Sequence, residues 1–403
     1  MTSFPTTLYG VPFEFAIFAA VLAGVALFHR RALSIALTGL VAVLLFQGTV
    51  GAFPAGQGLG ALAAHAAHEW VILANLMLLL VGFELLSNQF EQSNLPGRMP
   101  GLLPDDWTGG VALLAVVFGL SAFLDNIAAA VIGGVMARHV YRGRVGVGFL
   151  AAIVASANAG GAGSGIGDTP TTMMWLNGVS PLTVLAAYVP AGVAFAVVAV
   201  FAARAQQRLQ PIQVDGEPGP PLVWRRVVIV AVILGAAIAA NITANRLDNP
   251  PSDAPWLGLA VWAAILATAP FARPDWALIR PAAKGALFLV SLVATASLMP
   301  VDALPPPSWV STLGLGFLSA VFDNIPLTAL ALEQGGYDWA FLAYAVGFGG
   351  SMIWFGSSAG VALTTIFPQG RSVVAWVRQG WFVPVGYVAG YAVAMLILGW
   401  RPV

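Results

Sequence analysis

Long apolar runs, separated by short polar loops, fill the chain from end to end. Ten of them are long enough to cross a bilayer as a helix of about 20 residues. These runs are 11–28, 32–50, 70–87, 145–178, 181–203, 224–243, 256–272, 283–299, 339–368 and 380–400. Two further apolar segments, 109–137 and 309–335, each contain an Asp-Asn pair near the centre. The pattern predicts an all-α polytopic membrane protein.

The two Asp-Asn pairs lie in matching heptapeptides. Residues 121–127 read Ser-Ala-Phe-Leu-Asp-Asn-Ile, and residues 319–325 read Ser-Ala-Val-Phe-Asp-Asn-Ile. An aspartate in hydrocarbon costs roughly 2.5–3.5 kcal/mol, so a chain that carries one there is expected to use it. A helix-capping role for Asp125 and Asp323 is the structural alternative. Their occurrence in matching context favours a duplicated fold with an ion or substrate site between the copies.

Composition supports a membrane protein and narrows its chemistry. Of the 403 residues, 59% are hydrophobic and 8% are charged, whereas soluble domains carry about 25% charged residues. The net charge is zero, which gives no reason to expect a nucleic-acid partner. The sequence has no cysteine, which excludes disulfides, thiolate metal sites and cysteine catalysis. The expected partners are membrane lipid and a small transported solute.

The arginines and lysines indicate how the two Asp-Asn segments enter the membrane. If both segments cross the whole bilayer, Arg138, Arg142 and Arg144 lie outside, against the positive-inside rule. If both are re-entrant hairpins, all seventeen basic residues except Arg246 and Arg401 are cytoplasmic. The charge pattern therefore favours ten full spans and two hairpins in the cell (inner) membrane, with both termini extracytoplasmic.

The map divides into two equal parts, each with three spans, a hairpin and two spans. Because five spans is an odd number, the second part is inverted relative to the first, as in secondary transporters with a site near the midplane. The predicted boundaries are 1–209 for the first inverted repeat (hairpin 109–137, broken helix 145–178), 210–222 for a linker, and 223–403 for the second inverted repeat (hairpin 309–335, broken helix 339–368).

Glycine-rich stretches interrupt one span in each half, at 158–170 and at 347–360. Broken helices expose carbonyls that bind cations and N–H groups that bind anions. Close helix packing is the alternative, since small residues let helices approach. Packing alone does not require Asn158, Asp168 or Thr169, so the pattern favours a binding site.

Several of these motifs together resemble the NhaD-type sodium/proton antiporters of the ion transporter superfamily. They are Leu124-Asp125-Asn126-Ile127, Asn158-Ala159-Gly160-Gly161, Ile166-Gly167-Asp168, Thr171-Thr172-Met173, Asp323-Asn324-Ile325-Pro326-Leu327-Thr328 and Gly356-Ser357-Ser358-Ala359-Gly360-Val361. The resemblance implies a scaffold domain, a mobile transport domain that contains the hairpins, an elevator motion and a homodimer.

Exchange of sodium, or another monovalent cation, for protons is the favoured function. Hard cations prefer oxygen ligands, and a proton can compete with the cation for a carboxylate. The candidate ion- or substrate-binding residues are Asp125, Asn126, Asn158, Ser164, Asp168, Thr169, Asp323, Asn324, Ser357 and Ser358. Sodium is expected at Asp125, Asn126, Asn158 and Asp168. No cofactor is expected besides bound sodium and transported protons.

Two other functions stay open from the residues alone. Cation-coupled uptake of citrate or a dicarboxylate would use helix N-termini to hold the anion, although three carboxylates would repel it. The Gly165-Ile166-Gly167-Asp168 stretch also fits an intramembrane aspartyl protease, which needs a second aspartate.

Outside the motifs, two pairs of residues carry expectations. His65 and His68 are expected in an outer loop, and Trp175 and Trp354 are expected to pack on the site.

Overall fold

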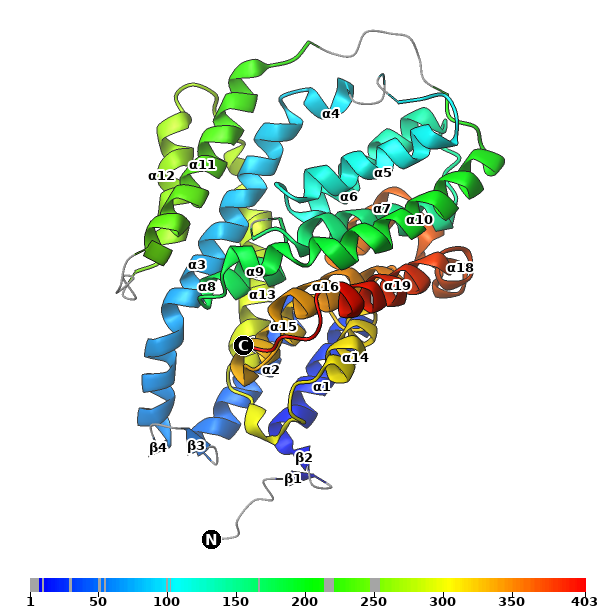
Figure 1. The fold of residues 1–403 in the computed structure, drawn as a ribbon. Coiled ribbons are helices and arrows are strands. Elements are labelled where there is room, and N and C mark those ends of the chain that lie inside the picture. Colours follow the sequence, from blue (N-terminus) through cyan, green and yellow to red (C-terminus); the bar gives the residue numbers. More distant parts are fainter. Residues whose placement is uncertain are drawn as a thin grey trace. The chain divides into compact units, whose positions relative to one another are not determined.

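The protein is helical almost throughout its described part (Figure 1). The computed structural model describes residues 7–8, 11–28, 31–49, 52–53, 56–98, 101, 103–165, 167–213, 221–246 and 254–403. Ile166 and residues 214–220 of the expected linker lie outside the described residues, as do the side chains of His68 and Arg246. Two short antiparallel pairs are the strands seen in the described part: β1 (Thr7–Leu8) with β2 (Val11–Pro12), and β3 (Ala52–Phe53) with β4 (Gly56–Gln57).

Every predicted span and hairpin is helical. In the first half the helices are α1 (Phe13–Leu27), α2 (Ala32–Thr49), α3 (Leu59–Glu91), α4 (Leu95–Arg98), α5 (Trp107–Ser121), α6 (Asn126–Val140), α7 (Val147–Ala162), α8 (Thr169–Leu176), α9 (Pro181–Leu185) and α10 (Tyr188–Leu209). In the second half they are α11 (Trp224–Arg246), α12 (Trp256–Thr268), η3 (Trp276–Leu278), α13 (Ile279–Ala296), η4 (Val301–Ala303), α14 (Trp309–Ser319), α15 (Asn324–Gln334), α16 (Trp339–Gly349), η5 (Gly350–Met352), α17 (Ser358–Ile366), η6 (Pro368–Arg371), α18 (Val373–Gln379) and α19 (Phe382–Ile397).

The chain is a multi-pass membrane protein. Among the described residues, four stretches are helical, long and apolar enough to cross a membrane: Ala32–Thr49, Glu69–Glu91, Pro181–Leu209 and Trp276–Ala296. The pair α18 and α19, bent by 56°, provides a fifth candidate. Several other apolar helices are shorter, among them three of the four that flank the two Asp-Asn turns. The arrangement of ten full spans and two hairpins stays a prediction.

Both predicted helix interruptions are present. The expected span 145–178 is divided into α7 and α8, and the expected span 339–368 into α16 and α17. Each Asp-Asn segment is likewise two helices joined by a turn, α5 with α6 and α14 with α15. The glycines and the Asp-Asn pairs mark these breaks because neither favours a continuous helix.

Two compact units make up the structure, and each draws on both halves of the sequence. Unit 1 comprises residues 1–85, 232–306 and 329–335, and unit 2 comprises residues 86–231, 307–328 and 336–403. Unit 2 contains both Asp-Asn turns and both helix breaks. The grouping by contacts thus differs from the predicted repeats, which describe an order along the chain and stay a prediction.

In unit 1, polar groups join apolar helices. The Asn75 Oδ1 atom on α3 accepts a hydrogen bond from the N–H of Gly258 on α12, at 2.9 Å. Trp262 on α12 donates through Nε1 to the carbonyl of Leu78, also at 2.9 Å. The expected outer loop around His65 is wrong, because His65 lies within α3, where its Nε2 is 3.2 Å from Ser297 Oγ. The apolar residues that precede Glu69 extend the helix beyond the predicted span.

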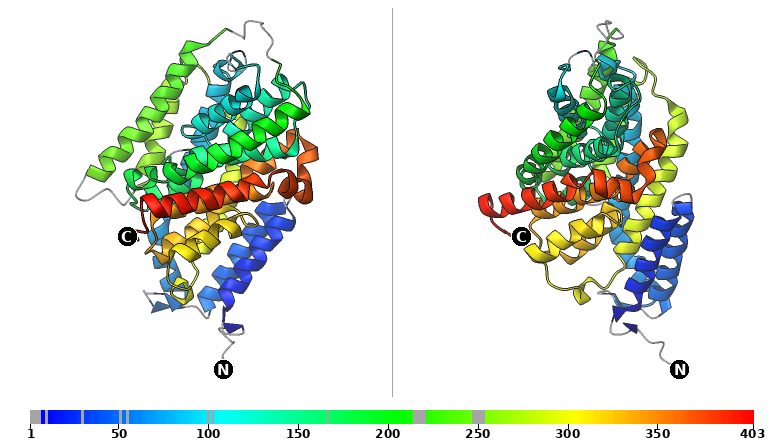
Figure 2. Two further views of the ribbon diagram at one scale, coloured as in Figure 1. Left: turned by 45° about the vertical axis from the view of Figure 1, so that its right-hand side comes forward. Right: turned by 90° about the vertical axis from the view of Figure 1, so that its right-hand side faces the viewer.

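In unit 2, α7 is the central helix, and all of its residues are buried. Helices α5, α6, α10 and α16 contact it. A helix that is apolar on every side is expected in a core of this kind. Helices α10 and α19 run side by side in this unit (Figure 2). The polar residues near the end of α7 are therefore held inside a packed helical core.

Candidate functional site

Each Asp-Asn turn begins a helix with its aspartate as the cap. Asp125 accepts a hydrogen bond from the N–H of Ile127 at 3.0 Å, and Asp323 accepts one from the N–H of Ile325 at 3.1 Å. A side-chain oxygen at this position satisfies a backbone donor that the helix leaves free. The capping interpretation is therefore confirmed for one carboxylate oxygen in each half.

Asn126 connects the first hairpin to both sides of the first helix break. Its Nδ2 donates to Asn158 Oδ1 on α7 at 3.1 Å and to Asp168 Oδ1 at 3.0 Å. Asn158 in turn donates through Nδ2 to Ser351 Oγ in η5, at 2.9 Å. All four side chains are buried. Unit 2 thus brings residues from both sequence halves into one polar cluster.

Asp168 is the most deeply buried carboxylate of this cluster, with 4% of its surface exposed. It stands at the cap position of α8 but makes no side-chain cap bond. Instead, the hydroxyls of Thr171 and Thr172 donate to its backbone carbonyl, at 2.9 and 3.0 Å. The carboxylate is consequently directed to Asn126 rather than to its own helix.

One oxygen of Asp168 is left without a hydrogen bond. Oδ1 accepts from Asn126, and the backbone N–H of Thr169 lies near the carboxylate, but Oδ2 is buried with no hydrogen-bond partner. Asp125 and Asp323 are close enough to interact with it electrostatically. An unsatisfied buried carboxylate oxygen is costly. A proton or a cation at Oδ2 would remove that cost.

In the second half of the chain, the carboxylate of the Asp-Asn pair has a hydrogen bond at each oxygen. Ser358 Oγ donates to Asp323 Oδ2 at 3.3 Å, so that both oxygens of Asp323 are hydrogen-bonded. Ser357 caps α17 by accepting from the N–H of Gly360 at 3.4 Å. Asn324 is buried beside Asp323 in the chain. Among the expected residues of this half, the structure links Asp323 to Ser358 and uses Ser357 as a cap.

Ser164 and Thr169 lie in the loop and first turn after the first break. The Ser164 hydroxyl donates to the carbonyl of Ala122 in the hairpin turn at 2.6 Å and accepts from the N–H of Gly167 at 3.0 Å. Ser164 thus ties the loop to the hairpin turn. The side chain of Thr169 is half-buried.

Equivalent glycines bring the broken helices against the hairpins in both halves. A Cβ atom on Gly160 would lie 2.0 Å from the carbonyl oxygen of Phe118, and one on Gly349 would lie 2.2 Å from that of Gly316. Phe118 and Gly316 are separated by the same offset as Asp125 and Asp323. The packing interpretation of these glycines is confirmed, and their contacts follow the predicted repeat.

Some buried polar groups of α5, α7 and η5 were not among the expected site residues. Ser121 and Ser156 each have a buried hydroxyl without a hydrogen-bond partner, and Ser351 receives the bond from Asn158. Ser121 lies in the heptapeptide 121–127 and Ser351 lies in the glycine-rich stretch 347–360. These positions could have marked both serines as candidate site residues. Ser156 offered no such signal, because a serine in a buried helix commonly bonds its own backbone.

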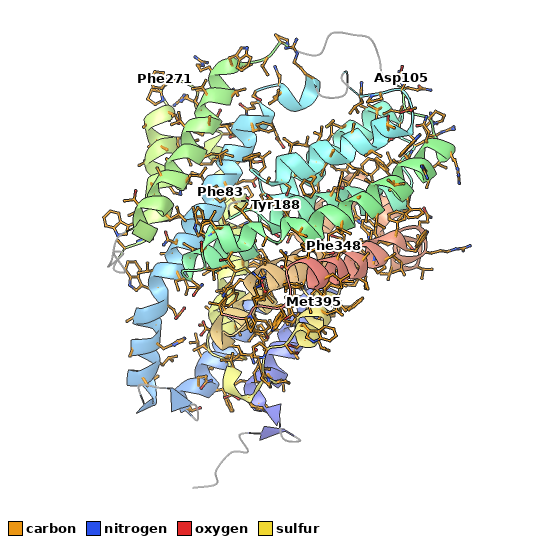
Figure 3. All side chains as sticks on the ribbon, viewed as in Figure 1. Phe83, Asp105, Tyr188, Phe271, Phe348 and Met395 are labelled. Atoms are coloured by element: carbon orange, nitrogen blue, oxygen red, sulfur yellow. The ribbon has the colours of Figure 1, made fainter. Side chains whose placement is uncertain are left out.

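Aromatic side chains line the first break. The Trp175 ring lies 3.5 Å from where a Cβ on Gly165 would be, which confirms its expected contact with the interruption. Tyr188 on α10, labelled in Figure 3, donates its hydroxyl to the carbonyl of Gly160 at 3.0 Å. This carbonyl belongs to the last turn of α7, where helical partners run out.

The described residues include no group of three or more His, Cys, Asp or Glu placed to hold a metal ion. Carboxylates alone therefore do not complete a coordination shell here. Amide and hydroxyl oxygens, such as those of Asn158 and the nearby serines, would have to supply the remaining ligands of a cation.

Comparison with known proteins identifies distant relatives. No family model matches the chain. Sodium/proton antiporters 1 and 2 of Arabidopsis thaliana are each 27% identical to it, over 78% and 70% of this chain and 58% and 72% of their own lengths. The Na(+)/H(+) antiporter NhaD of Halomonas elongata is 33% identical over 23% of this chain and 19% of its own length.

The chain thus spans little more than half the length of the first of these relatives. Among solved structures, the YdaH transporter of Alcanivorax borkumensis matches with a TM-score of 0.47 and 11% identity, over 91% of this chain and 97% of that one. The homologues are transporters and not enzymes.

Proposed function

We propose that the chain exchanges sodium, or another monovalent cation, for protons, as the names of its distant relatives state for those proteins. The observation that carries the proposal is the buried Asp168 carboxylate, which has one oxygen bonded to Asn126 and the other without a hydrogen-bond partner. A group of this kind needs a positive partner. A cation and a proton are the two partners that an antiporter moves.

Competition for this carboxylate is enough to couple the two fluxes. When a proton is bound, the carboxylate loses its charge and its attraction for a cation. When a cation is bound, its charge disfavours protonation of the same group. Asp125 and Asp323 add negative charge nearby, which attracts either positive species. The predicted sodium ligands Asp125, Asn126, Asn158 and Asp168 form the first half-site.

The two halves of the chain are proposed to be inverted repeats that form the site together. Support comes from the matched glycine contacts and from the two Asp-Asn caps at one sequence offset. Alternating access would then expose the site to each side in turn. Both termini outside the cell membrane, and a homodimeric assembly, belong to the same proposal.

An exchange assay in everted membrane vesicles tests the function. Addition of sodium, lithium or potassium to vesicles that hold a proton gradient is expected to release protons from the wild-type vesicles. Asp125→Asn and Asp323→Asn are expected to reduce this signal to that of vesicles without the protein. The matched control is Asp105→Asn, which removes the same charge from an exposed position before α5 (Figure 3).

The folded state of each variant is checked by size-exclusion chromatography in detergent. Wild-type exchange rates in both site variants would sink the proposal. Uptake of labelled citrate into proteoliposomes, measured in parallel, would favour an organic-anion transporter if it occurred while cation exchange did not.

A further inference from the structure

Six exposed arginines gather at one end of unit 2, outside the polar cluster. They come from the end of α6, the turn before α7, the end of α10 and α18. We call them the arginine patch: Arg138, Arg142, Arg144, Arg204, Arg208 and Arg378. Patches of four to eight basic residues beside membrane spans are typical of anionic-lipid sites.

Hydrogen bonds hold the segments of the patch together. Gln206 on α10 accepts from the N–H of Gly146 and donates to the carbonyl of Arg144, both at 2.8 Å. The N–H of Gln213 donates to the carbonyl of Val140 at 2.8 Å. These bonds fix the turn between α6 and α7 against the end of α10. The arginines of the three segments therefore form one surface.

Arg378 of α18 belongs to the same surface. The carbonyl oxygen of the next residue, Gln379, lies 2.6 Å from where a Cβ atom on Gly148 would be. Gly148 stands in the first turn of α7. The end of α18 therefore packs against the start of α7, beside the turn that carries Arg144.

Among the described residues, three arginines of the patch have no acidic partner. In the part of the chain that the structure describes, Arg138, Arg144 and Arg208 form no ion pair with a carboxylate. Two acidic residues, Asp105 and Asp106, precede α5. Asp106 is occupied by the N–H and hydroxyl of Thr108. Several guanidinium groups are consequently available to an external anion.

The contact of one arginine with a tryptophan indicates where the patch lies relative to the lipid headgroups. The Arg204 guanidinium lies over the ring of Trp107, 4.6 Å from the ring centroid. Tryptophan rings prefer the level of lipid headgroups. A guanidinium stacked on such a ring is placed at the height where headgroup phosphates lie.

We propose that the arginine patch binds the headgroups of anionic phospholipids in the cytoplasmic leaflet. Guanidinium groups bind phosphate oxygens through paired N–H donors, which an ammonium group cannot do. The cytoplasmic leaflet carries most of the anionic lipid, and the arginine distribution of the whole chain places this end on that side. The proposal does not depend on which solute the protein transports.

Lipid binding to the purified protein tests the proposal. The protein is placed in phosphatidylcholine nanodiscs, and the affinity for phosphatidylglycerol is measured by native mass spectrometry. The test variant is R138Q/R144Q/R208Q, whose three side chains make no hydrogen bond to the described residues. Each arginine near a membrane surface contributes about fivefold in affinity, so the triple variant is expected to bind about 100-fold more weakly.

The matched control is R273Q/R280Q/K284Q, which removes three exposed basic residues of unit 1. It is expected to bind as the wild type does. The conservative variant R138K/R144K/R208K is expected to bind with intermediate affinity, because it keeps the charge and loses the paired donors. This lysine variant also serves as the folded comparison if the glutamine variant does not fold.

Three results would overturn the proposal. The first is wild-type affinity for phosphatidylglycerol in R138Q/R144Q/R208Q or in its lysine counterpart. The second is an equal loss of affinity in the unit 1 control, which would indicate a general effect of the charge near the membrane. The third is complete displacement of the lipid by inorganic phosphate at millimolar concentration, which would indicate a site for the free anion.

Discussion

At the scale of single residues, the side chain of Asp168 makes no cap bond to its own helix and is bonded to the hairpin. The hydroxyls of Thr171 and Thr172 satisfy its backbone carbonyl, and Asn126 holds one carboxylate oxygen. The other oxygen is unsatisfied. In the second half, Ser357 stands where Asp168 stands in the first. Asp323, the counterpart of Asp125, has both carboxylate oxygens hydrogen-bonded. The two half-sites are therefore chemically unequal, and the first has the greater need of a bound positive charge.

Substitution of Gly167 tests the close approach that places Asp168. A Cβ atom there would lie 1.9 Å from the carbonyl oxygen of Ser121, which belongs to the hairpin. Gly167→Ala is expected to lower the free energy of unfolding by about 1–3 kcal/mol, because the loop must move away from the hairpin. The measurement is the thermal melting temperature in detergent.

The control for that variant is Gly192→Ala on α10. A Cβ atom on Gly192 meets no heavy atom within 4 Å, so alanine there is expected to stabilise the helix by roughly 0.5–1 kcal/mol. Equal melting temperatures for Gly167→Ala and the wild type would contradict the tight contact.

At the scale of elements, each Asp-Asn segment and each glycine-interrupted span became two helices. The first hairpin is well defined at both ends. Asp106 caps α5 by accepting from Thr108, and Asp125 caps α6 by accepting from Ile127. Helices α5 and α6 then pack on each other. Local capping chemistry therefore fixes where the hairpin begins and where it turns.

Acid should weaken the Asp106 cap outside the membrane. Hydrogen bonds from the Thr108 hydroxyl and N–H lower the pKa of Asp106 below its ordinary value. A carboxylate with a lowered pKa in the folded state stabilises fully above the unfolded pKa, and this contribution is lost as pH falls through the folded pKa. Near pH 6 the melting temperature of the wild type should be higher than that of Asp106→Asn. This margin in melting temperature should be small because the group is exposed.

The margin should close as the pH falls below about 3.9, the ordinary pKa of aspartate. Melting temperatures of both proteins between pH 3 and pH 7 provide the measurement. Thr108→Val, which removes the hydroxyl donor, should narrow the margin at pH 6. A margin that does not change with pH would rule out titration of this cap.

At the scale of the whole molecule, sequence order and spatial grouping differ. The predicted repeats divide the chain near residue 210, but each compact unit takes segments from both halves. Both Asp-Asn turns and both helix breaks fall in unit 2. This grouping keeps the polar cluster inside one compact unit.

Cysteine labelling tests the inverted orientation of the two halves. Asp105 and Ala303 precede the two hairpins at the same offset as the two Asp-Asn pairs, and both are exposed. In an inverted repeat, Asp105→Cys reacts with a membrane-impermeant maleimide from the cytoplasmic side and Ala303→Cys from the outside. The natural chain has no cysteine, so the wild type is the unlabelled control. Labelling of both positions from one side would exclude the inversion.

The sequence by itself determined the elements and the chemistry that they carry. Apolar length predicted the helices, glycines predicted the breaks in α7–α8 and α16–α17, and the Asp-Asn pairs predicted the turns. These features depend on neighbours in the chain, so they can be derived locally. The same reasoning placed His65 in a loop and was wrong, because nothing local ends the helix before it.

Only the tertiary structure decided which of the expected residues meet and which oxygen is left over. Asn126 reaches Asp168 across 42 positions, and Asn158 reaches Ser351 across 193. Such contacts depend on how α6, α7 and η5 pack within unit 2, and no periodicity or cap in the chain encodes them. The unsatisfied oxygen of Asp168 is likewise a result of packing, because burial removes the water that would otherwise satisfy it.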